Sequence, residues 1–234
     1  MILVLWDIDR TLLYVGDIDR LVYRELFEEA VGRPPQVLPQ RGTGTTMPIA
    51  VHELLTANGV SATAAAQLAA QIVKKMPTQL NRHRTKLRKD GRLMPGAMIA
   101  LQAVHRAPQL IPTVVTGNLQ GSAQIKLEAL GLAGLVDTTV GGYASDDSHR
   151  PALVRIAQQR AETAYGQPFT RKNTVIIGDS LQDVRTGTEG GAKVIGVASG
   201  TNSAKSLKGE GADYVLPDLT DTDRLLELIR TATA

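Results

Sequence analysis

Cysteine is absent from the 234-residue sequence, which excludes disulfide bonds, thiolate metal ligands and a cysteine nucleophile. Aromatic residues make up only 3% of the chain, so we expect a core built mainly from Leu, Val, Ile and Ala. No apolar run approaches the roughly 18 residues that a transmembrane helix requires. Because Met1 leads directly into a strand-like run that ends in acids, without a basic leader, we expect a cytoplasmic protein with no signal peptide and no membrane partner.

A large excess of charge of one sign is also missing. The 26 basic residues exceed the 23 acidic ones by a net charge of only +3, and the 43% hydrophobic share is ordinary for a globular protein. The basic run at 82–89 is interpreted as the solvated face of a helix. We therefore expect no nucleic-acid partner, and the sequence gives no indication of the oligomeric state.

Short apolar runs, each followed by turn residues, predict a sheet of about six strands. The runs span residues 2–6, 110–118, 135–142, 173–180, 192–200 and 213–217. Helical patterns separate several of them, for example at 119–130 and 151–165. Continuous apolar strands that alternate with helices are typical of a parallel sheet covered on both faces. The predicted fold class is α/β, with a Rossmann-like parallel-sheet core.

The segment 14–91 has a different pattern, because no strand-like run occurs in it. Helix-period patterns predict four helices instead, at 17–32, 47–59, 62–76 and 78–89. We therefore predict a catalytic core formed by residues 1–13 and 92–234. A helical cap domain, residues 14–91, interrupts this core after its first strand.

Polar residues gather where the predicted strands end. They are Asp7, Asp9 and Thr11 after the first run, Thr116, Gly117 and Asn118 at the end of the second, Asp179, Ser180 and Asp183 after the fourth, and Arg150 just before a helix. Ligands of parallel α/β sheets bind at the carboxyl ends of the strands. The sequence thus predicts one site at this edge.

The residue types at this edge suit phosphoryl chemistry. Clustered carboxylates repel one another unless a cation neutralises them, and Mg²⁺ prefers oxygen ligands of this kind. Thr116 and Arg150 are groups that cradle a phosphoryl group and neutralise its charge. One carboxylate can then attack phosphorus while a second carboxyl transfers protons. We interpret Asp7 and Asp9 as a nucleophile and its proton shuttle, with a shared metal ion.

Three short motifs carry a family resemblance. The stretches "DIDRT" at 7–11, "VVTGN" at 114–118 and "GDSLQD" at 178–183 resemble signatures of the haloacid dehalogenase-like hydrolase superfamily. Their order and spacing, with a helical insert after the first strand, resemble its phosphoglycolate phosphatase-like branch in particular. The resemblance implies a Mg²⁺-dependent phosphatase that works through a covalent aspartyl-phosphate.

The resemblance also implies roles for single residues. Asp7 would be the nucleophile and a Mg²⁺ ligand, and Asp9 would be the general acid and base and bind Mg²⁺ through its backbone carbonyl. Asp179 would bind Mg²⁺ directly or through water, with Asp183 supporting it. A carboxylate at the place of Asp9 favours phosphate esters, because dehalogenases of the superfamily lack it.

The same resemblance assigns phosphoryl binding to Thr116, with the backbone of Gly117 and Asn118. The cap loop "GTTMP" at 44–48 offers Thr45 and Thr46 as substrate-binding candidates. It lacks the Arg and Asp of the family's Gly-Arg-Thr-Asp-Pro, which disfavours a small carboxylate substrate such as phosphoglycolate.

Two further departures concern cations. Arg10 stands where the family usually has Gly, and Arg150 before Pro151 stands where it usually has Lys before Pro. Lys126 is the rival candidate for the phosphate-stabilising cation, although its position favours a structural surface pair.

These observations predict a phosphatase for a small phosphorylated metabolite, with a cap that closes over the site and excludes water. One alternative is a phosphomutase of the same superfamily, which transfers the phosphoryl group to a substrate hydroxyl. Another is a catalytically weak metabolite-binding or interaction protein.

Overall fold

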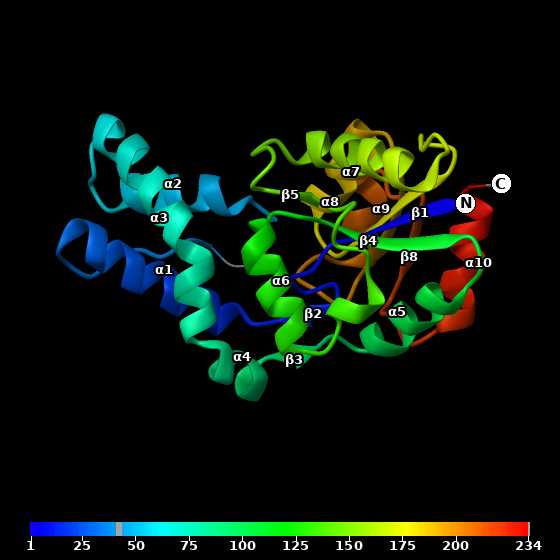
Figure 1. Ribbon diagram of the computed structural model, residues 1–234, viewed down its shortest axis with the longest axis horizontal. Helices are drawn as coiled ribbons and strands as arrows, with labels where there is room; N and C mark the ends of the chain where they lie inside the picture. The colour runs from blue at the N-terminus through cyan, green and yellow to red at the C-terminus, as the bar shows by residue number, and fades with distance from the viewer. Residues whose placement is uncertain (41–43, 234) are drawn as a thin grey trace.

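The computed structural model describes residues 1–40 and 44–233 (Figure 1). A six-stranded parallel sheet has the order β5-β4-β1-β6-β7-β8. The strands are β1 (Ile2–Trp6), β4 (Leu110–Thr116), β5 (Gly142–Tyr143), β6 (Thr174–Gly178), β7 (Lys193–Val197) and β8 (Tyr214–Leu216). The chain builds the sheet from β1 outward to one side and then from β6 outward to the other. The order therefore reverses beside β1, where ligand sites of such sheets lie.

Apolar side chains bury both faces of the central strands. Along β1, Leu3 and Leu5 belong to the hydrophobic cluster on one face, whereas Val4 and Trp6 belong to the cluster on the other. This alternation follows from the two-residue period of a strand. Burial of each such side chain contributes about 1.5–3 kcal/mol, which makes the position of β1 in the middle of the sheet strongly favoured.

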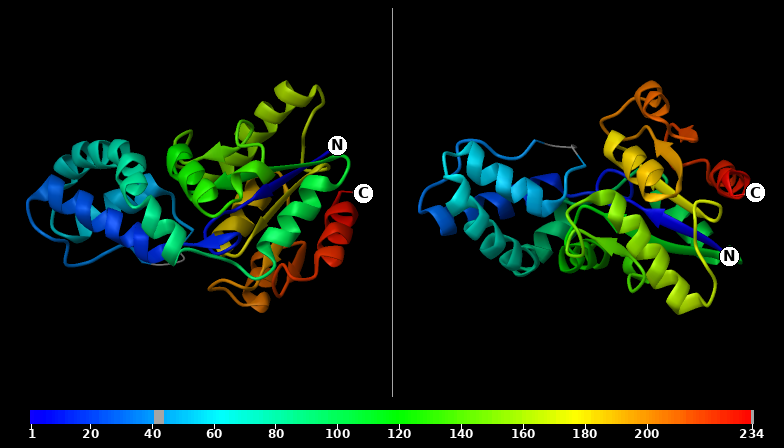
Figure 2. Two further views of the ribbon diagram at one scale, coloured as in Figure 1. Left: turned by 60° about the horizontal axis from the view of Figure 1, so that its bottom comes forward. Right: turned by 90° about the horizontal axis from the view of Figure 1, so that it is seen from above.

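Helices cover both faces of the sheet (Figures 1 and 2). On one face lie α5 (Ala97–Arg106), α6 (Gln120–Ala129) and α10 (Thr222–Ala232), and on the other lie α7 (Arg150–Tyr165), α8 (Leu181–Gly190) and α9 (Ala204–Glu210). This is the predicted Rossmann-like α/β architecture, which is confirmed.

The prediction of a strand at 135–142 is wrong for residues 135–141, and the strand begins only at Gly142. A short 3₁₀ helix, η1 (Ala133–Leu135), begins the segment, and only Gly142 and Tyr143 pair with β4. The cause is a turn that begins at Asp137, whose Oδ1 accepts hydrogen bonds from the Thr139 amide at 3.0 Å and the Thr139 hydroxyl at 2.5 Å. Such an Asx turn gives the backbone an alternative to strand pairing.

The helices of the insert gather on one side of the sheet, beyond the carboxyl ends of its strands (Figures 1 and 2). They are α1 (Gly16–Val31), α2 (Met47–Ala57), α3 (Ala62–Arg82) and α4 (Arg84–Asp90). α3 packs on α1 and α2, and both α3 and α4 contact α6 of the core. The two connections to the core, β2 (Leu13–Tyr14) and β3 (Arg92–Leu93), pair as antiparallel strands. The predicted division into core and cap stays a prediction, and both of its boundaries fall at this pair.

α3 is longer than predicted, because it continues through Pro77 instead of ending before it. A proline inside a helix removes one backbone hydrogen bond and needs compensation. Pro77 lies against Gly121 of α6, where an added β-carbon would come within 3.1 Å of the proline ring. Gly121 has no side chain, and it therefore allows α6 to approach α3 closely at Pro77.

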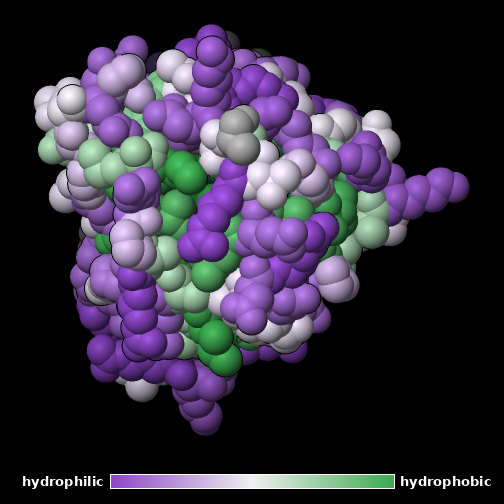
Figure 3. Space-filling view, turned by 90° about the vertical axis from the view of Figure 1, so that its right-hand side faces the viewer, coloured by the Kyte–Doolittle hydropathy of each residue, from purple (hydrophilic) through white to green (hydrophobic). Residues whose placement is uncertain are grey.

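The end of the core opposite the helical insert is mainly hydrophilic, with a band of hydrophobic residues between hydrophilic ones (Figure 3). Among the described residues, none of the helices is both long enough and apolar enough to span a lipid bilayer.

Candidate active site

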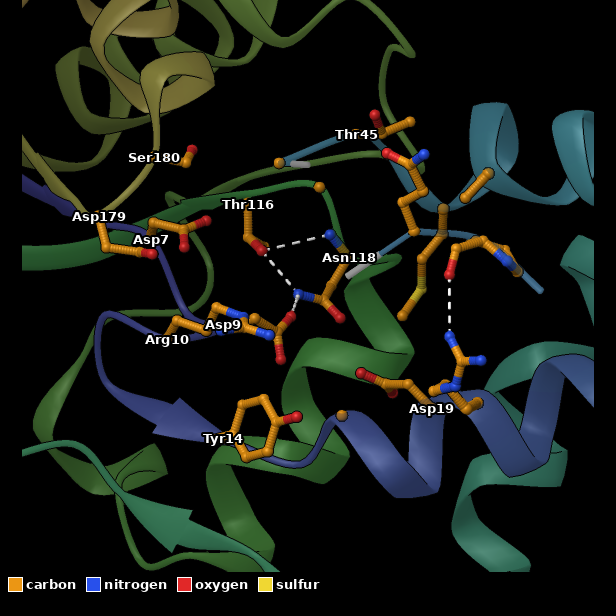
Figure 4. Close-up of a pocket in the computed structure, with 18 of the residues that line it drawn as sticks. Asp7, Asp9, Arg10, Tyr14, Asp19, Thr45, Thr116, Asn118, Asp179 and Ser180 are labelled. Carbon is orange, nitrogen blue, oxygen red and sulfur yellow. Dashed lines mark hydrogen bonds between the residues drawn. The ribbon is translucent and has the colours of Figure 1, made fainter. Parts of the chain in front are cut away.

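Three neighbouring strands end at the same place (Figure 4). Trp6, the last residue of β1, is in register with Val114 of β4 and Ile177 of β6. The residues that follow therefore meet at one edge, and the amide of Asp7 donates to the Ile177 carbonyl at 2.9 Å.

Three buried carboxylates form a cluster at this edge. Asp7, Asp179 and Asp183 each offer an oxygen that lies within 4.8 Å of the other two. Burial raises the pKa of Asp7 well above its usual value, the charge of Asp183 raises it further, and Arg150 partly opposes the shift. Burial and Asp183 also raise the pKa of Asp179 to about 7. Such a cluster of ionised acids calls for a cation.

One oxygen of the Asp179 carboxylate lacks a hydrogen-bond partner among the described residues. Thr11 donates from its hydroxyl to Asp179 Oδ1 at 3.1 Å, whereas Asp179 Oδ2 is buried and has no hydrogen-bond partner in the described part of the chain. A β-carbon at Gly200 would lie 1.8 Å from that oxygen, so a larger residue there would displace the Asp179 carboxylate. An all-oxygen donor set with one unsatisfied buried oxygen fits a hard divalent cation.

Arg150 lies beside Asp7. Only 4% of its side chain is exposed, and Nη2 donates to Asp7 Oδ1 at 3.1 Å and to Asp183 Oδ1. Nη1 donates to the carbonyl of Gly44, in the loop that enters α2, at 2.6 Å. The first residue of α7 thus brings a fixed positive charge to the acidic cluster and connects it to the helical insert.

Asp183 is already satisfied by neighbouring donors. Its Oδ2 accepts from the Ser180 amide at 2.9 Å and the Ser180 hydroxyl at 2.6 Å, and the Ser180 hydroxyl in turn accepts from the Asp183 amide at 3.1 Å. This capping box begins α8 and fixes the carboxylate that holds Arg150. The geometry suits Asp183 to a supporting role in the cluster.

The Asp9 side chain points away from the carboxylate cluster. Its Oδ2 accepts from Asn118 Nδ2 at 2.7 Å, and Lys126 Nζ lies 2.9 Å from Oδ1 and 3.1 Å from Oδ2. Lys126 also contacts Asp19 of α1 at 2.8 Å and is fully buried. The expected surface pair for Lys126 is therefore wrong, because α6 turns this residue inward against the helical insert.

The Thr116 hydroxyl accepts from the Asn118 amide at 3.2 Å and from Asn118 Nδ2 at 2.8 Å. Its own hydrogen therefore remains available to a ligand. Gly117 permits a close crossing of the loop that leads into α2, since an added β-carbon would lie 2.9 Å from the Thr45 carbonyl. Thr45 lines the cavity, whereas the buried Thr46 hydroxyl contacts the carbonyl of Ser148 at 3.3 Å.

Arg10 has a left-handed backbone, with a φ of 70°. This conformation explains why glycine suits the position better than other residues. The Arg10 guanidinium lies over the ring of Tyr14, 5.0 Å from its centre, and that of Arg92 lies 4.9 Å from the same ring. Arg10 thus lines the cavity next to the paired strands that lead into the insert.

A cavity of about 160 Å³ connects the acidic edge with the helical insert (Figure 4). The core contributes Asp7, Asp9, Thr116, Asn118 and Asp179, and the insert contributes Asp19, Arg20, Tyr23, Met47 and Ala50, among others. The structure thus brings the predicted residues of three strands together around one small space. Thr11, Asp19 and Gly200 lie beside these residues, and no pattern in the sequence predicted a role for them.

Raised pKa values in the acidic cluster predict how stability depends on pH and metal. Since the pKa of Asp179 rises from 3.8 to about 7 on folding, the folded protein binds more protons than the unfolded one across that range. Stability of the metal-free protein should therefore decrease as pH rises toward 7. Metal binding requires ionised carboxylates, so Mg²⁺ should raise the melting temperature more at about pH 8 than at about pH 6. Thermal melts with Mg²⁺ or EDTA check this, with Asp179→Asn as a control that should lose the difference.

The fold and the acidic edge define an α/β enzyme with its site at the carboxyl ends of the central strands. The sequence profile of haloacid dehalogenase-like hydrolases matches residues 4–187. The chain therefore belongs to the haloacid dehalogenase-like hydrolase family, as its motifs predicted.

Solved structures resemble the whole chain. A hydrolase from Pseudomonas syringae is 21% identical, with a TM-score of 0.67 over 96% of this chain and 97% of that one. A predicted phosphatase from Clostridium acetobutylicum is 18% identical, with a TM-score of 0.66 over 97% and 98%. A protein of Bacteroides vulgatus assigned as a beta-phosphoglucomutase is 19% identical, with a TM-score of 0.65 over 100% and 90%. These likenesses show the shared fold, and no curated protein matched the sequence.

Proposed function

We propose that the protein is a Mg²⁺-dependent phosphatase that hydrolyses a small phosphorylated metabolite. The observation that carries this proposal is the buried Asp7 carboxylate, 3.1 Å from Arg150 and clustered with Asp179 at the end of a small cavity. A nucleophile, a fixed cation and oxygen donors for a metal thus surround one point, as phosphoryl transfer requires.

Binding of the ester uses the groups around that point. The Thr116 hydroxyl and the Gly117 and Asn118 backbone would donate to the phosphoryl oxygens, and Arg150 would neutralise their charge. Asp7, Asp179 and the Asp9 backbone carbonyl would hold Mg²⁺, with Asp183 in support. When bound, the ion would offset the negative charge of the carboxylates and the phosphoryl group.

Chemistry then proceeds in two displacements. An Asp7 carboxylate oxygen attacks phosphorus, and the bond from phosphorus to the ester oxygen breaks while Asp9 gives that oxygen its proton. In the second step Asp9 accepts a proton from water, whose oxygen attacks phosphorus and releases Asp7 and inorganic phosphate. Each step uses Asp9 in the opposite protonation state, so the residue returns to its starting form.

The cavity supports a small substrate. About 160 Å³ between the core and the helical insert suits a metabolite better than a macromolecule. In this proposal residues 14–91 form a cap that closes over the ester and excludes water, and residues 1–13 and 92–234 form the catalytic core. A cytoplasmic location remains a prediction from the sequence.

A phosphomutase is the second candidate, favoured by the likeness to the Bacteroides vulgatus protein over 100% of this chain. It would use the same first step, and a substrate hydroxyl would replace water in the second. A catalytically weak binding protein fits less well, because Asp7, Asp9, Arg150 and Asp179 are all present at the site.

Phosphate release tests the proposal. We expect Mg²⁺-dependent release from at least one member of a panel of aryl, sugar and other alkyl phosphate monoesters, and none in EDTA. Rearranged phosphate ester in place of free phosphate, seen by ³¹P NMR, would favour the mutase. Binding of an ester without any turnover would favour the binding protein.

A further inference from the structure

Lys126 is a fully buried cation whose partners both face the cavity. Its ammonium lies 2.9 and 3.1 Å from the two oxygens of Asp9 and 2.8 Å from Asp19 Oδ2. Both aspartates line the cavity, whereas Lys126 lies behind them. Burial of an ammonium costs several kcal/mol unless its hydrogen bonds are satisfied. Asp9 and Asp19 satisfy the Lys126 ammonium, and both are residues of the candidate active site.

The contacts fix the Asp9 carboxylate from two directions. Lys126 approaches it from α6, and Asn118 Nδ2 donates to Oδ2 from the loop after β4 at 2.7 Å. The Asp9 side chain remains 37% exposed, while that of Lys126 is 0% exposed. The Asp9 carboxylate thus lines the cavity, and its contacts with Lys126 and Asn118 fix its orientation.

Asp19 connects this arrangement to the helical insert. It lies in the first turn of α1, whereas Lys126 and Asp9 belong to segments of the sheet core. Its side chain is 19% exposed, so the contact with Lys126 is largely shielded from water. Lys126 therefore joins the proposed proton-transfer group to the first helix of the insert through two ion pairs.

We propose that Lys126 is a positioning residue that holds the Asp9 carboxylate toward the ester oxygen, with Asp19 as its anchor on the insert. This inference rests on the proposed phosphatase function and adds a residue to it. Lys126 keeps its proton throughout and touches neither the phosphoryl group nor the leaving group. Its loss should therefore harm the transfer of a proton to the leaving oxygen and spare phosphoryl binding.

Leaving groups of different basicity separate a positioning role from a structural one. A p-nitrophenolate departs without a proton, whereas an alkoxide requires one, so general-acid catalysis matters mainly for alkyl esters. We expect Lys126→Met to lower kcat/KM for an alkyl phosphate by roughly 10²-fold, and that for p-nitrophenyl phosphate by less than about threefold. kcat/KM is the quantity to compare, because it reports the first displacement alone. Lys126→Arg should restore part of the alkyl activity.

Lys126→Met leaves Asp9 and Asp19 without their cation, so a double variant with Asp19→Asn protects the test against misfolding. It should show the same selective loss, and Lys86→Met on an exposed ion pair is the matched control. Equal losses on both esters, no loss on the alkyl ester, or failure of both variants to fold would each overturn the inference. If wild-type turnover is absent or survives Asp7→Asn, the proposed function itself fails, which separates the two results.

Discussion

Asp7→Asn should abolish phosphate release, with kcat/KM reduced by about 10⁴-fold or more. The amide has the size of the carboxylate and can still accept a hydrogen bond from Arg150, which lies 3.1 Å from Asp7 Oδ1 in the structure. It cannot, however, serve as the anionic nucleophile. Phosphate release from the best ester of the panel, measured with saturating Mg²⁺, checks the prediction.

The same substitution should leave the fold intact. Burial and Asp183 already raise the pKa of Asp7, so a neutral side chain at this position removes an unfavourable charge from the metal-free protein. We expect an unchanged or higher melting temperature in EDTA. Asp223→Asn, on the exposed side of the first turn of α10, is the matched control and should keep full activity.

A covalent intermediate provides the second readout. Intact-protein mass spectrometry after rapid quenching of wild type with substrate should detect one added phosphoryl group, and Asp7→Asn should not acquire it. Turnover that persists in Asp7→Asn would contradict the proposed nucleophile and transfer the role to another group of the acidic cluster.

Local sequence signals were sufficient for the central strands and for the residues that follow them. β1 and β6 are continuous apolar runs that end at Asp7 and Asp179, and a parallel sheet brings such ends together. The order of the motifs therefore predicted which side chains meet. Positions next to a strand end depend little on the details of packing.

Residues whose role depends on packing between distant elements were harder to predict. The prediction of a surface pair for Lys126 failed because nothing in the α6 pattern indicates that α1 brings Asp19 against it. Gly200 lies far along the chain from Asp179, and only the folded loop brings the two together. Tertiary contacts of this kind have no periodic signature in the sequence.

Two local features also went against their usual pattern. Pro77 predicts a helix end, but α3 continues through it where it packs against Gly121. The run at 135–142 has strand-like composition, but the side chain of Asp137 satisfies the amide of Thr139 and ends the strand pattern. In each case a specific contact outweighs an average preference.

Arg150→Met should produce the other large effect, because it removes the one positive charge that directly contacts both Asp7 and Asp183 among the described residues. Breaking a buried ion pair on one side costs about 3–5 kcal/mol, so the melting temperature in EDTA should fall clearly. Mg²⁺ should recover part of that loss, since it neutralises the same carboxylates. kcat/KM should fall by roughly 10³-fold through the loss of charge stabilisation on the phosphoryl group.

Arg150→Lys tests whether the charge or the shape of the guanidinium matters. Nη1 of Arg150 donates to the Gly44 carbonyl, and Nη2 donates to Asp7 and Asp183. The single ammonium of a lysine cannot make both contacts in the geometry of a guanidinium. We expect Arg150→Lys to retain the fold and to lose about tenfold in kcat/KM, far less than Arg150→Met. Arg155→Met, at an exposed position of the same helix, is the matched control for both variants. An Arg150→Met protein with wild-type turnover would show that other groups neutralise the phosphoryl charge. The arginine would then serve only to hold the carboxylates and the loop at Gly44 in place.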